Sequence, residues 1–256
     1  MGKVIAVANR KGGVGKTTTS VNLAASLVAT RKRVLLIDVD PQGNATMGSG
    51  VDKNQQENTL NELLLGTSEI STVKVSTKAG YDLLPSNSDL TMAEVQLLQS
   101  EQRERRLSNI LSSIVSEYDF IIIDCPPALN ILTLNALVVA NSLLIPMQCE
   151  YYALEGLSEV IRTMKQIRQT INPNLQVEGI LRTMYDGRNR LSIEVSEQLL
   201  AHFGDKVFRT VIPRNVRLAE APSYGMPALH YDKRSQGAIA YLALAGEILK
   251  KQQQGI

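Results

Sequence analysis

Residues 4–18 read Val-Ile-Ala-Val-Ala-Asn-Arg-Lys-Gly-Gly-Val-Gly-Lys-Thr-Thr, and the glycine-rich part begins at Lys11. The apolar run 4–8 predicts a buried strand, and a helix is expected to start at Lys16. Glycines between a strand and a helix let several backbone N–H groups point at one anion, and the helix adds its positive N-terminal end. The stretch therefore predicts a phosphate-binding loop whose cradle consists of Gly12, Gly13, Val14 and Gly15.

The loop departs from the general phosphate-loop pattern at one position. Lys16 is placed to reach the β- and γ-phosphates of a nucleotide, and the Thr17 hydroxyl is placed to ligate Mg²⁺. Where the general pattern has its first glycine, this chain has Arg10, and a second lysine, Lys11, follows it. The strict pattern fails, although every phosphate-cradling element is present.

The composition is that of an ordinary soluble globular protein, with 44% hydrophobic and 20% charged residues in 256. This length suits one large α/β domain over residues 1–256. Neither Cys125 nor Cys149 belongs to a CxxC pair, so we expect no disulfide and no metal or iron–sulfur site built on them. Residue 1 is not followed by a signal peptide, and no apolar run reaches membrane-spanning length. We expect a cytoplasmic protein.

Short apolar runs alternate with helical patterns along the whole chain, which predicts an α/β fold with a mostly parallel, twisted sheet flanked by helices on both faces. The expected strands are 3–8, 33–37, 81–84, 120–123, 142–146, 176–182 and 207–212. The expected helices are 16–30, 59–65, 90–116, 131–140, 154–169, 191–202 and 235–251. Residues 51–78 show the weakest pattern.

Acidic residues follow two of the expected strands at the end where open α/β sheets bind ligands. Asp38 and Asp40 lie two residues apart where the strand 33–37 ends, and Asp124 follows the apolar strand 120–123. The Asp124 arrangement is typical of a carboxylate that holds Mg²⁺ through its water shell. Asp38 is a further candidate for the magnesium shell, with a purely structural capping role as the alternative.

The formal net charge is only +2, but basic residues are concentrated in the C-terminal third. Between residues 206 and 217 there are four basic side chains and no acidic one. This concentration predicts an anion-binding face. The candidate contacts are Arg188, Arg214, Arg217 and Arg234.

The chain resembles the ParA/Soj family of partition ATPases, within the deviant-Walker group that also includes MinD. The resemblance is carried by KGGVGKTT at 11–18, DVDPQGNAT at 38–46, IIIDCPP at 121–127, PMQCEYYALEGL at 146–157 and VIPRNVRLAEAP at 211–222. These segments cover nearly the whole length. The chain starts almost directly at its first strand, so we expect the short chromosomal type.

The resemblance implies ATP and Mg²⁺ as cofactors and assigns roles to residues. Lys16 would bind phosphate with Thr18 beside the α-phosphate, and Lys11 would reach across a homodimer into the partner's nucleotide. Asp40 would position the attacking water, while Thr17, Asp38 and Asp124 would form the magnesium shell. The remaining nucleotide contacts it implies are Glu150, approaching ribose across the dimer, and Met184, Pro213 and Asn215 beside the base.

Cys125 stands where many fast phosphate-loop ATPases have a catalytic Glu, so intrinsic hydrolysis should be slow. The resemblance further implies that the ATP-bound dimer binds double-stranded DNA without sequence preference, in the nucleoid. A ParB-like, centromere-bound partner would stimulate hydrolysis and release the DNA. Phosphate contacts alone give such sequence-independent, salt-sensitive affinity.

The alternative is a MinD-like regulator that cycles on and off a membrane. It would need a C-terminal amphipathic helix with a basic face and bulky apolar residues. The last helix instead carries Ile239, Tyr241, Leu242, Ile248 and Leu249 and is followed by glutamines, a pattern that favours core packing. An iron–sulfur carrier is disfavoured by the placement of the cysteines.

Overall fold

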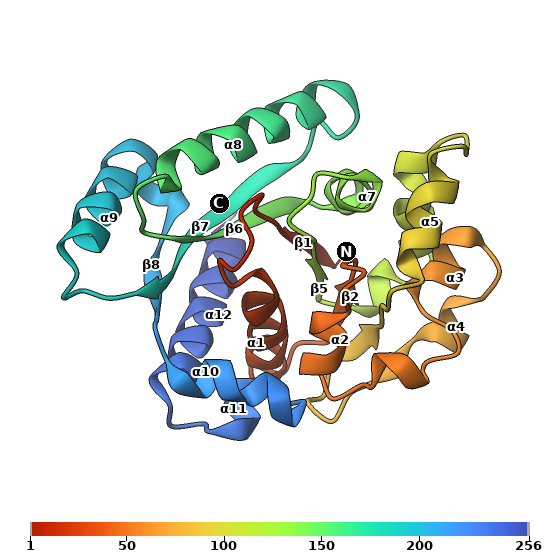
Figure 1. Ribbon diagram of the computed structural model, residues 1–256, viewed down its shortest axis with the longest axis horizontal. Coiled ribbons are helices and arrows are strands. Elements are labelled where there is room, and N and C mark those ends of the chain that lie inside the picture. Colours follow the sequence, from red (N-terminus) through yellow and green to blue (C-terminus); the bar gives the residue numbers. More distant parts are fainter. Residues whose placement is uncertain (1, 255–256) are drawn as a thin grey trace.

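A computed structural model describes residues 2–254 and contains one sheet of eight strands, in the order β3-β4-β2-β5-β1-β6-β7-β8 (Figure 1). Neighbouring strands are parallel except for β3 and β4, which are antiparallel. The strands are Lys3–Val7 (β1), Val34–Asp38 (β2), Val75–Ser76 (β3), Asp82–Leu84 (β4), Phe120–Asp124 (β5), Ser142–Gln148 (β6), Gln176–Tyr185 (β7) and Val207–Pro213 (β8). The predicted α/β class and mostly parallel sheet are confirmed.

Helices cover both faces of the sheet because alternate strand residues enter two separate cores. In β1, Ile5 and Val7 pack with one helix layer, whereas Val4 and Ala6 pack with the other. The first layer contains Lys16–Ala29 (α1), Val216–Glu220 (α10), Ala228–Tyr231 (α11) and Gln236–Gln254 (α12). The second contains Leu60–Leu65 (α3), Leu90–Leu97 (α5), Arg106–Leu111 (α6), Ile131–Val139 (α7), Ala153–Thr170 (α8) and Arg190–Phe203 (α9).

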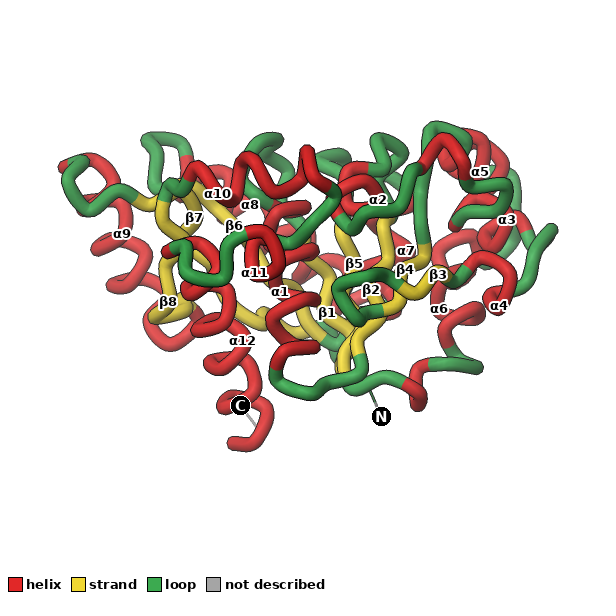
Figure 2. Tube along the Cα trace, turned by 90° about the horizontal axis from the view of Figure 1, so that it is seen from below, coloured by secondary structure: helices red, strands yellow, loops and turns green. Residues whose placement is uncertain are grey.

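Two short helices, Asn44–Gly48 (α2) and Ile70–Val73 (α4), complete the α-helices of the described residues. Seen along the sheet, α2 and α10 lie at one end of the molecule and the last turn of α12 at the other (Figure 2). Within residues 2–254, no helix combines the length and the apolar character needed to cross a membrane.

The single helix predicted for 90–116 is wrong. The chain forms α5, a 3-10 turn at Arg103–Arg105, α6 and a second 3-10 turn at Val115–Glu117. Gln102, between the end of α5 and the first 3-10 turn, adopts a left-handed conformation with φ of 52°, which a continuous helix would not contain. The Asn135 side chain of α7 fixes the break, because it donates to the Arg103 carbonyl and accepts from the Leu107 amide. A tertiary contact therefore overrides the local helical pattern.

Four other short elements were absent from the predictions, namely α2, α4, α10 and α11, as was the two-residue strand β3. Each of these has five residues or fewer. A segment of this length shows too few turns for apolar periodicity to register. The helix α10 matters most, because it carries residues on which the basic face depends.

We predict that Gly179→Ala destabilises the fold. A Cβ at position 179 in β7 would lie 2.4 Å from Cε2 of Phe208, which is fully buried. The strained core should lower the free energy of unfolding by about 1–3 kcal/mol, measured as a shift in the urea midpoint. Gly246→Ala in α12, where a Cβ would meet nothing within 4 Å, is the matched control and should not lower it. Equal midpoints for the two variants would contradict this packing argument.

Candidate functional site

The glycine-rich loop joins β1 to α1 and is held in shape by two side chains. The Asn9 carboxamide accepts from the Lys11 amide at 3.1 Å and donates to the Pro146 carbonyl at 2.8 Å. Thr183 donates its hydroxyl to the Val14 carbonyl at 2.8 Å. Gly13 and Gly15 have φ of 73° and 85°, a left-handed conformation that favours glycine. The loop is therefore fixed by β6 and β7 before any ligand enters.

The two lysines of the loop occupy different environments. Lys16 is only 7% exposed, and its ammonium donates to the Lys11 carbonyl at 3.0 Å. Burial lowers the pKa of Lys16, and the nearby Asp124 carboxyl partly opposes that effect. The side chain of Lys11 is 50% exposed and forms an ion pair with Glu150 of the same chain. One lysine thus lies inside the site and the other at its mouth.

Asp124 is fully buried at the end of β5 and touches the first turns of α1. Its carboxyl oxygens accept hydrogen bonds of 2.8 Å from the hydroxyls of Thr17 and Ser20. The strand register pairs it with Asp38 of β2. Burial, followed by repulsion from Asp38, raises the pKa of Asp124 well above the usual range.

Asp38 anchors the loop that follows β2. One of its oxygens accepts from the Asp40 amide, and the other accepts from the amide and hydroxyl of Thr46, both at 2.8 Å. Both oxygens are therefore engaged within the protein, as the structural alternative expects. Burial raises the pKa of this carboxyl as well. A magnesium role for Asp38 stays a prediction.

Asp40 is nearly buried, and one of its oxygens accepts from the Gln42 amide at 2.9 Å. The Ser86 hydroxyl donates to its carbonyl at 2.7 Å, which fixes the backbone at this point. For the other carboxyl oxygen, the described residues supply no hydrogen-bond donor. Asp40 also lies close enough to Lys16 of the phosphate loop for its charge to oppose the lowering of the pKa of Lys16.

The acidic and hydroxyl groups fit a magnesium ion that is shared with a phosphate. Mg²⁺ usually takes one or two protein oxygens, together with phosphate oxygens and water. Thr17 and Asp124 supply adjacent hydroxyl and carboxylate oxygens of that kind. Within residues 2–254, no three His, Cys, Asp or Glu side chains form a cluster able to hold a metal by themselves. The donor set suits an ion that arrives with its phosphates.

A cavity of about 220 Å³ opens beside the start of α1. Its walls bring together residues from four places in the sequence, among them Thr18, Met184, Pro213 and Asn215. Met184 has a φ of 48°, unusual for a residue with a side chain, where the register of β7 and β8 shifts. Met184 Sδ also lies 2.8 Å from the side-chain Nε2 of Gln148, which donates to it. The sequence-predicted base contacts of this chain therefore share one cavity, whereas Glu150 lies with Lys11.

The two cysteines are buried and are free thiols. Burial and the neighbouring Asp124 raise the pKa of the Cys125 thiol, so it remains protonated at neutral pH. Burial also raises the pKa of Cys149 to about 11. Cys125 therefore supplies no base beside the phosphate loop.

The four predicted DNA-contact arginines are exposed, and each lies beside an aspartate. Arg188 pairs with Asp186 at 2.9 Å, and Arg214 adds to the lowered pKa of that carboxyl. Arg217 lies 3.4 Å from Asp232, whose other oxygen accepts from the Arg234 amide. The basic face thus has two parts, one around each aspartate.

Several supporting residues were not singled out from the sequence. They are Asn9, Ser20 and Thr46, which orient the loop, Asp124 and Asp38 respectively. Ser20 lies one helical turn after Lys16, on the same face of the helix predicted to start there. Of the three residues, it is therefore the one that helical spacing could have identified. Asn9 acts across the fold through Pro146, and no local pattern identifies that contact. Thr46 lies eight residues after Asp38, within the quoted segment 38–46, but its role there was not predicted.

Asp124→Asn should change how stability depends on pH. Because the native pKa of Asp124 is raised above its unfolded value of about 3.9, the folded chain binds the extra proton. The stabilising contribution of Asp124 is fully present below its unfolded pKa of about 3.9 and is lost as the pH rises through its native pKa. In nucleotide-free protein, the melting temperature of the variant should therefore fall less than that of wild type between about pH 5 and pH 9.

Asp119→Asn is the control for that experiment, because Arg33 lowers the pKa of this half-buried carboxyl instead. The stabilising contribution of the Asp119 carboxylate is present above its ordinary pKa and is therefore constant between about pH 5 and pH 9. Asp119→Asn should thus leave the slope of melting temperature against pH unchanged in this range. An Asp124→Asn profile parallel to that of wild type would contradict the assignment of a destabilising buried carboxyl.

Comparison with known proteins identifies the family. Residues 2–177 match the family described as AAA domain. The chain is 51% identical to the sporulation initiation inhibitor protein Soj of Bacillus subtilis, over 97% of this chain and 98% of that one. It is 47% identical to the chromosome partitioning protein ParA of Caulobacter vibrioides, over 98% and 95%.

Among solved structures, cobyrinic acid a,c-diamide synthase of Mycobacterium smegmatis, with bound ATP analog and magnesium, matches with a TM-score of 0.88. That protein is 38% identical, and the match covers 100% of this chain and 98% of the other. The fold, the phosphate loop and the full-length relatives agree. The chain belongs to the ParA/Soj family of chromosome-partitioning proteins.

Proposed function

We propose that this chain is a slow, magnesium-dependent ATPase whose ATP-bound homodimer binds double-stranded DNA without sequence preference. A ParB-like partner bound to a centromere would stimulate hydrolysis and release the dimer from the nucleoid. The observation that carries the proposal is the contrast between buried Lys16 and half-exposed Lys11 on one phosphate loop. The first serves the chain's own nucleotide, and the second is available to a facing subunit.

The nucleotide would lie across the loop, with its base in the cavity lined by Met184, Pro213 and Asn215. Gly12, Gly13, Val14 and Gly15 would bind phosphates through backbone N–H groups, and Lys16 would exchange the Lys11 carbonyl for a phosphate oxygen. Thr17 and Asp124 would hold Mg²⁺, which neutralises phosphate charge when bound. The Mycobacterium smegmatis protein, with its ATP analog and magnesium, supports this assignment.

Asp40 is the group we assign to orienting water for attack on the terminal phosphate. It presents a carboxyl oxygen to the site, and its backbone is fixed by Ser86. Cys125 stays protonated where a carboxylate base would raise the rate. With only one group to position water, hydrolysis should be slow until a partner completes the site.

Lys11 is the group we assign to dimerisation. In the single chain its ammonium is neutralised by Glu150 at the surface. Two facing copies could exchange these partners, because an isologous interface brings the same patch of each chain to the other. Lys11 would then reach the partner's phosphates and Glu150 the partner's ribose. In the dimer, the internal pair of Lys11 and Glu150 would thus be replaced by two contacts to the partner's nucleotide.

The basic face supports DNA rather than a membrane as the surface that the dimer binds. Arg188, Arg214, Arg217 and Arg234 are exposed and offer guanidinium groups to phosphates. On the last helix, α12, Tyr241, Leu244 and Ile248 are fully buried in the core, although Ile239 is exposed. Most of the large apolar side chains of α12 thus serve the core, which favours the DNA-binding candidate over the membrane-cycling alternative.

Lys11→Ala should separate ATP binding from dimerisation. The variant keeps the glycine cradle and Lys16, so it should bind ATP about as well as wild type but remain monomeric by analytical ultracentrifugation. Lys16→Ala is the matched control on the same loop and should lose at least about 10-fold in nucleotide affinity, the loss of a charge-assisted hydrogen bond. An ATP-dependent dimer of Lys11→Ala would remove the cross-subunit role.

DNA binding measured with ATP, with ADP and without nucleotide tests the whole proposal. Wild type should bind a random-sequence duplex tightly only with ATP, and Arg217→Ala should weaken that binding and reduce its salt slope by about one phosphate per chain. Arg105→Ala removes an exposed arginine on the other side of the sheet, so it should leave the DNA affinity and the salt slope unchanged. Equal binding in all three nucleotide states would refute the cycle.

A further inference from the structure

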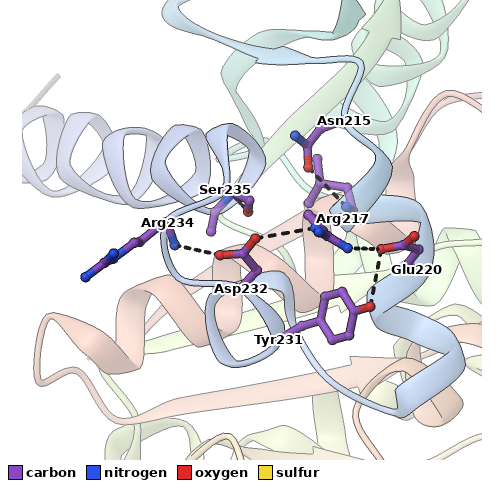
Figure 3. Close-up of polar contacts among 9 residues, drawn as sticks. Asn215, Arg217, Glu220, Tyr231, Asp232, Arg234 and Ser235 are labelled. Atoms are coloured by element: carbon purple, nitrogen blue, oxygen red, sulfur yellow. Dashed lines mark hydrogen bonds and ion pairs between the residues drawn. The ribbon is translucent and has the colours of Figure 1, made fainter.

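Arg217 is held between two carboxylates that come from different segments (Figure 3). Its Nη1 lies 2.8 Å from Oε2 of Glu220, and its Nε lies 3.4 Å from Oδ2 of Asp232. The same Glu220 oxygen accepts a hydrogen bond of 3.2 Å from the Tyr231 hydroxyl. The other oxygen of Asp232 accepts from the Arg234 amide at 3.1 Å. Both acids are therefore positioned by neighbours other than Arg217.

This arrangement differs from that of Arg188, the other arginine of the basic face with an ion pair among the described residues. Arg188 bonds one carboxylate two residues away, and its side chain is 91% exposed. The side chain of Arg217 is 49% exposed and spans from α10 to the loop after α11. A single exposed pair contributes little, whereas two fixed acceptors around a less exposed guanidinium keep it in one place. Arg217 is thus the most constrained member of the face.

A DNA phosphate at Arg217 would have to compete with these two carboxylates for the guanidinium. The Nη1 donates to Glu220 and the Nε lies within ion-pair distance of Asp232, so two of the three guanidinium nitrogens face internal anions. The two negative charges also oppose the approach of a phosphodiester. In the nucleotide-free chain, Arg217 is therefore engaged by internal anions.

The helix that carries Arg217 also forms one wall of the nucleotide cavity. Asn215, Leu218 and Ala219 line that cavity, and the Asn215 side chain accepts from the Leu218 amide to cap α10. Leu218 lies so close to Gly237 of α12 that a Cβ there would come within 2.5 Å of its Cγ. Since α10 has only five residues, a shift of its inner side moves Arg217 and Glu220 together.

We propose that Glu220 and Asp232 act as an internal competitor for DNA phosphate at Arg217, and that nucleotide in the cavity beneath α10 releases this arginine. The inference rests on the proposed function. It means that DNA binding is controlled in two ways, by dimer formation and by the release of Arg217. A base seated against Asn215 and Leu218 displaces α10 relative to Asp232, which is on the loop after α11. Arg217 then exchanges its carboxylates for a phosphodiester of the duplex.

The test compares wild type with Glu220→Gln, Asp232→Asn and the double variant on a random-sequence duplex, with ATP and without nucleotide. The amides keep the size of both side chains and remove the charges. Without nucleotide, the double variant should bind DNA about 10-fold more tightly than wild type, with a salt slope steeper by about one phosphate. Each single variant should give part of this gain, so the result does not depend on one variant folding well.

Two controls decide what causes a gain. Adding Arg217→Ala to the double variant should abolish it, because the released group is then missing. Glu101→Gln with Glu117→Gln makes the same charge change at exposed positions on the other side of the sheet and should give no gain. If the gain in DNA affinity survives Arg217→Ala, or if the Glu101→Gln, Glu117→Gln control shows an equal gain, then Glu220 and Asp232 do not compete with DNA for Arg217.

The remaining outcomes separate this inference from the proposed function. If wild type binds DNA with ATP but the double variant gains nothing without nucleotide, the internal competitor is wrong and the DNA-binding function stands. If neither protein binds DNA in either state, both are overturned.

Discussion

The parallel register between β2 and β5 is the constraint on which the rest of the site depends. It pairs Asp38 with Asp124, so two buried carboxyl groups lie at neighbouring strand ends. Neither is neutralised by a direct ion pair in the described chain. The Asp38 carboxyl is instead satisfied by the loop it anchors, and that of Asp124 by hydroxyls of α1. The protein thus retains a destabilising pair of acids where a cation bound with phosphates would relieve it.

The same strand ends explain why the phosphate loop needs no ligand to keep its shape. β1 lies between β5 and β6, and the Asn9 side chain ties the loop to the end of β6. Thr183 ties it to β7 on the far side of β6. Three parallel strands therefore fix the backbone of one loop. Preorganisation of this kind lowers the entropic cost of binding a phosphate.

Much of this architecture could be predicted from the sequence, because its signals are local. The loop from Lys11 to Thr18 and the strand ending at Asp124 are each encoded by consecutive residues of distinctive type. The break within 90–116 could not be predicted, since it is fixed by Asn135 from another helix. The same holds for Arg182, a buried guanidinium that bonds Ser196 and the carbonyls of β8. Such contacts join segments whose proximity only the fold creates.

The short helix α10 shows how two functions can depend on one small element. Leu218, which is buried, and Ala219 line the cavity, while Arg217 and Glu220 form an ion pair at the surface. A sequence pattern could identify Asn215 and Arg217 separately, but not that they belong to one rigid turn. A helix this short has little stability of its own, so its position is set by what packs against it. Anything bound in the cavity is among those neighbours, and the charge presented at the surface therefore depends on the occupancy of the cavity.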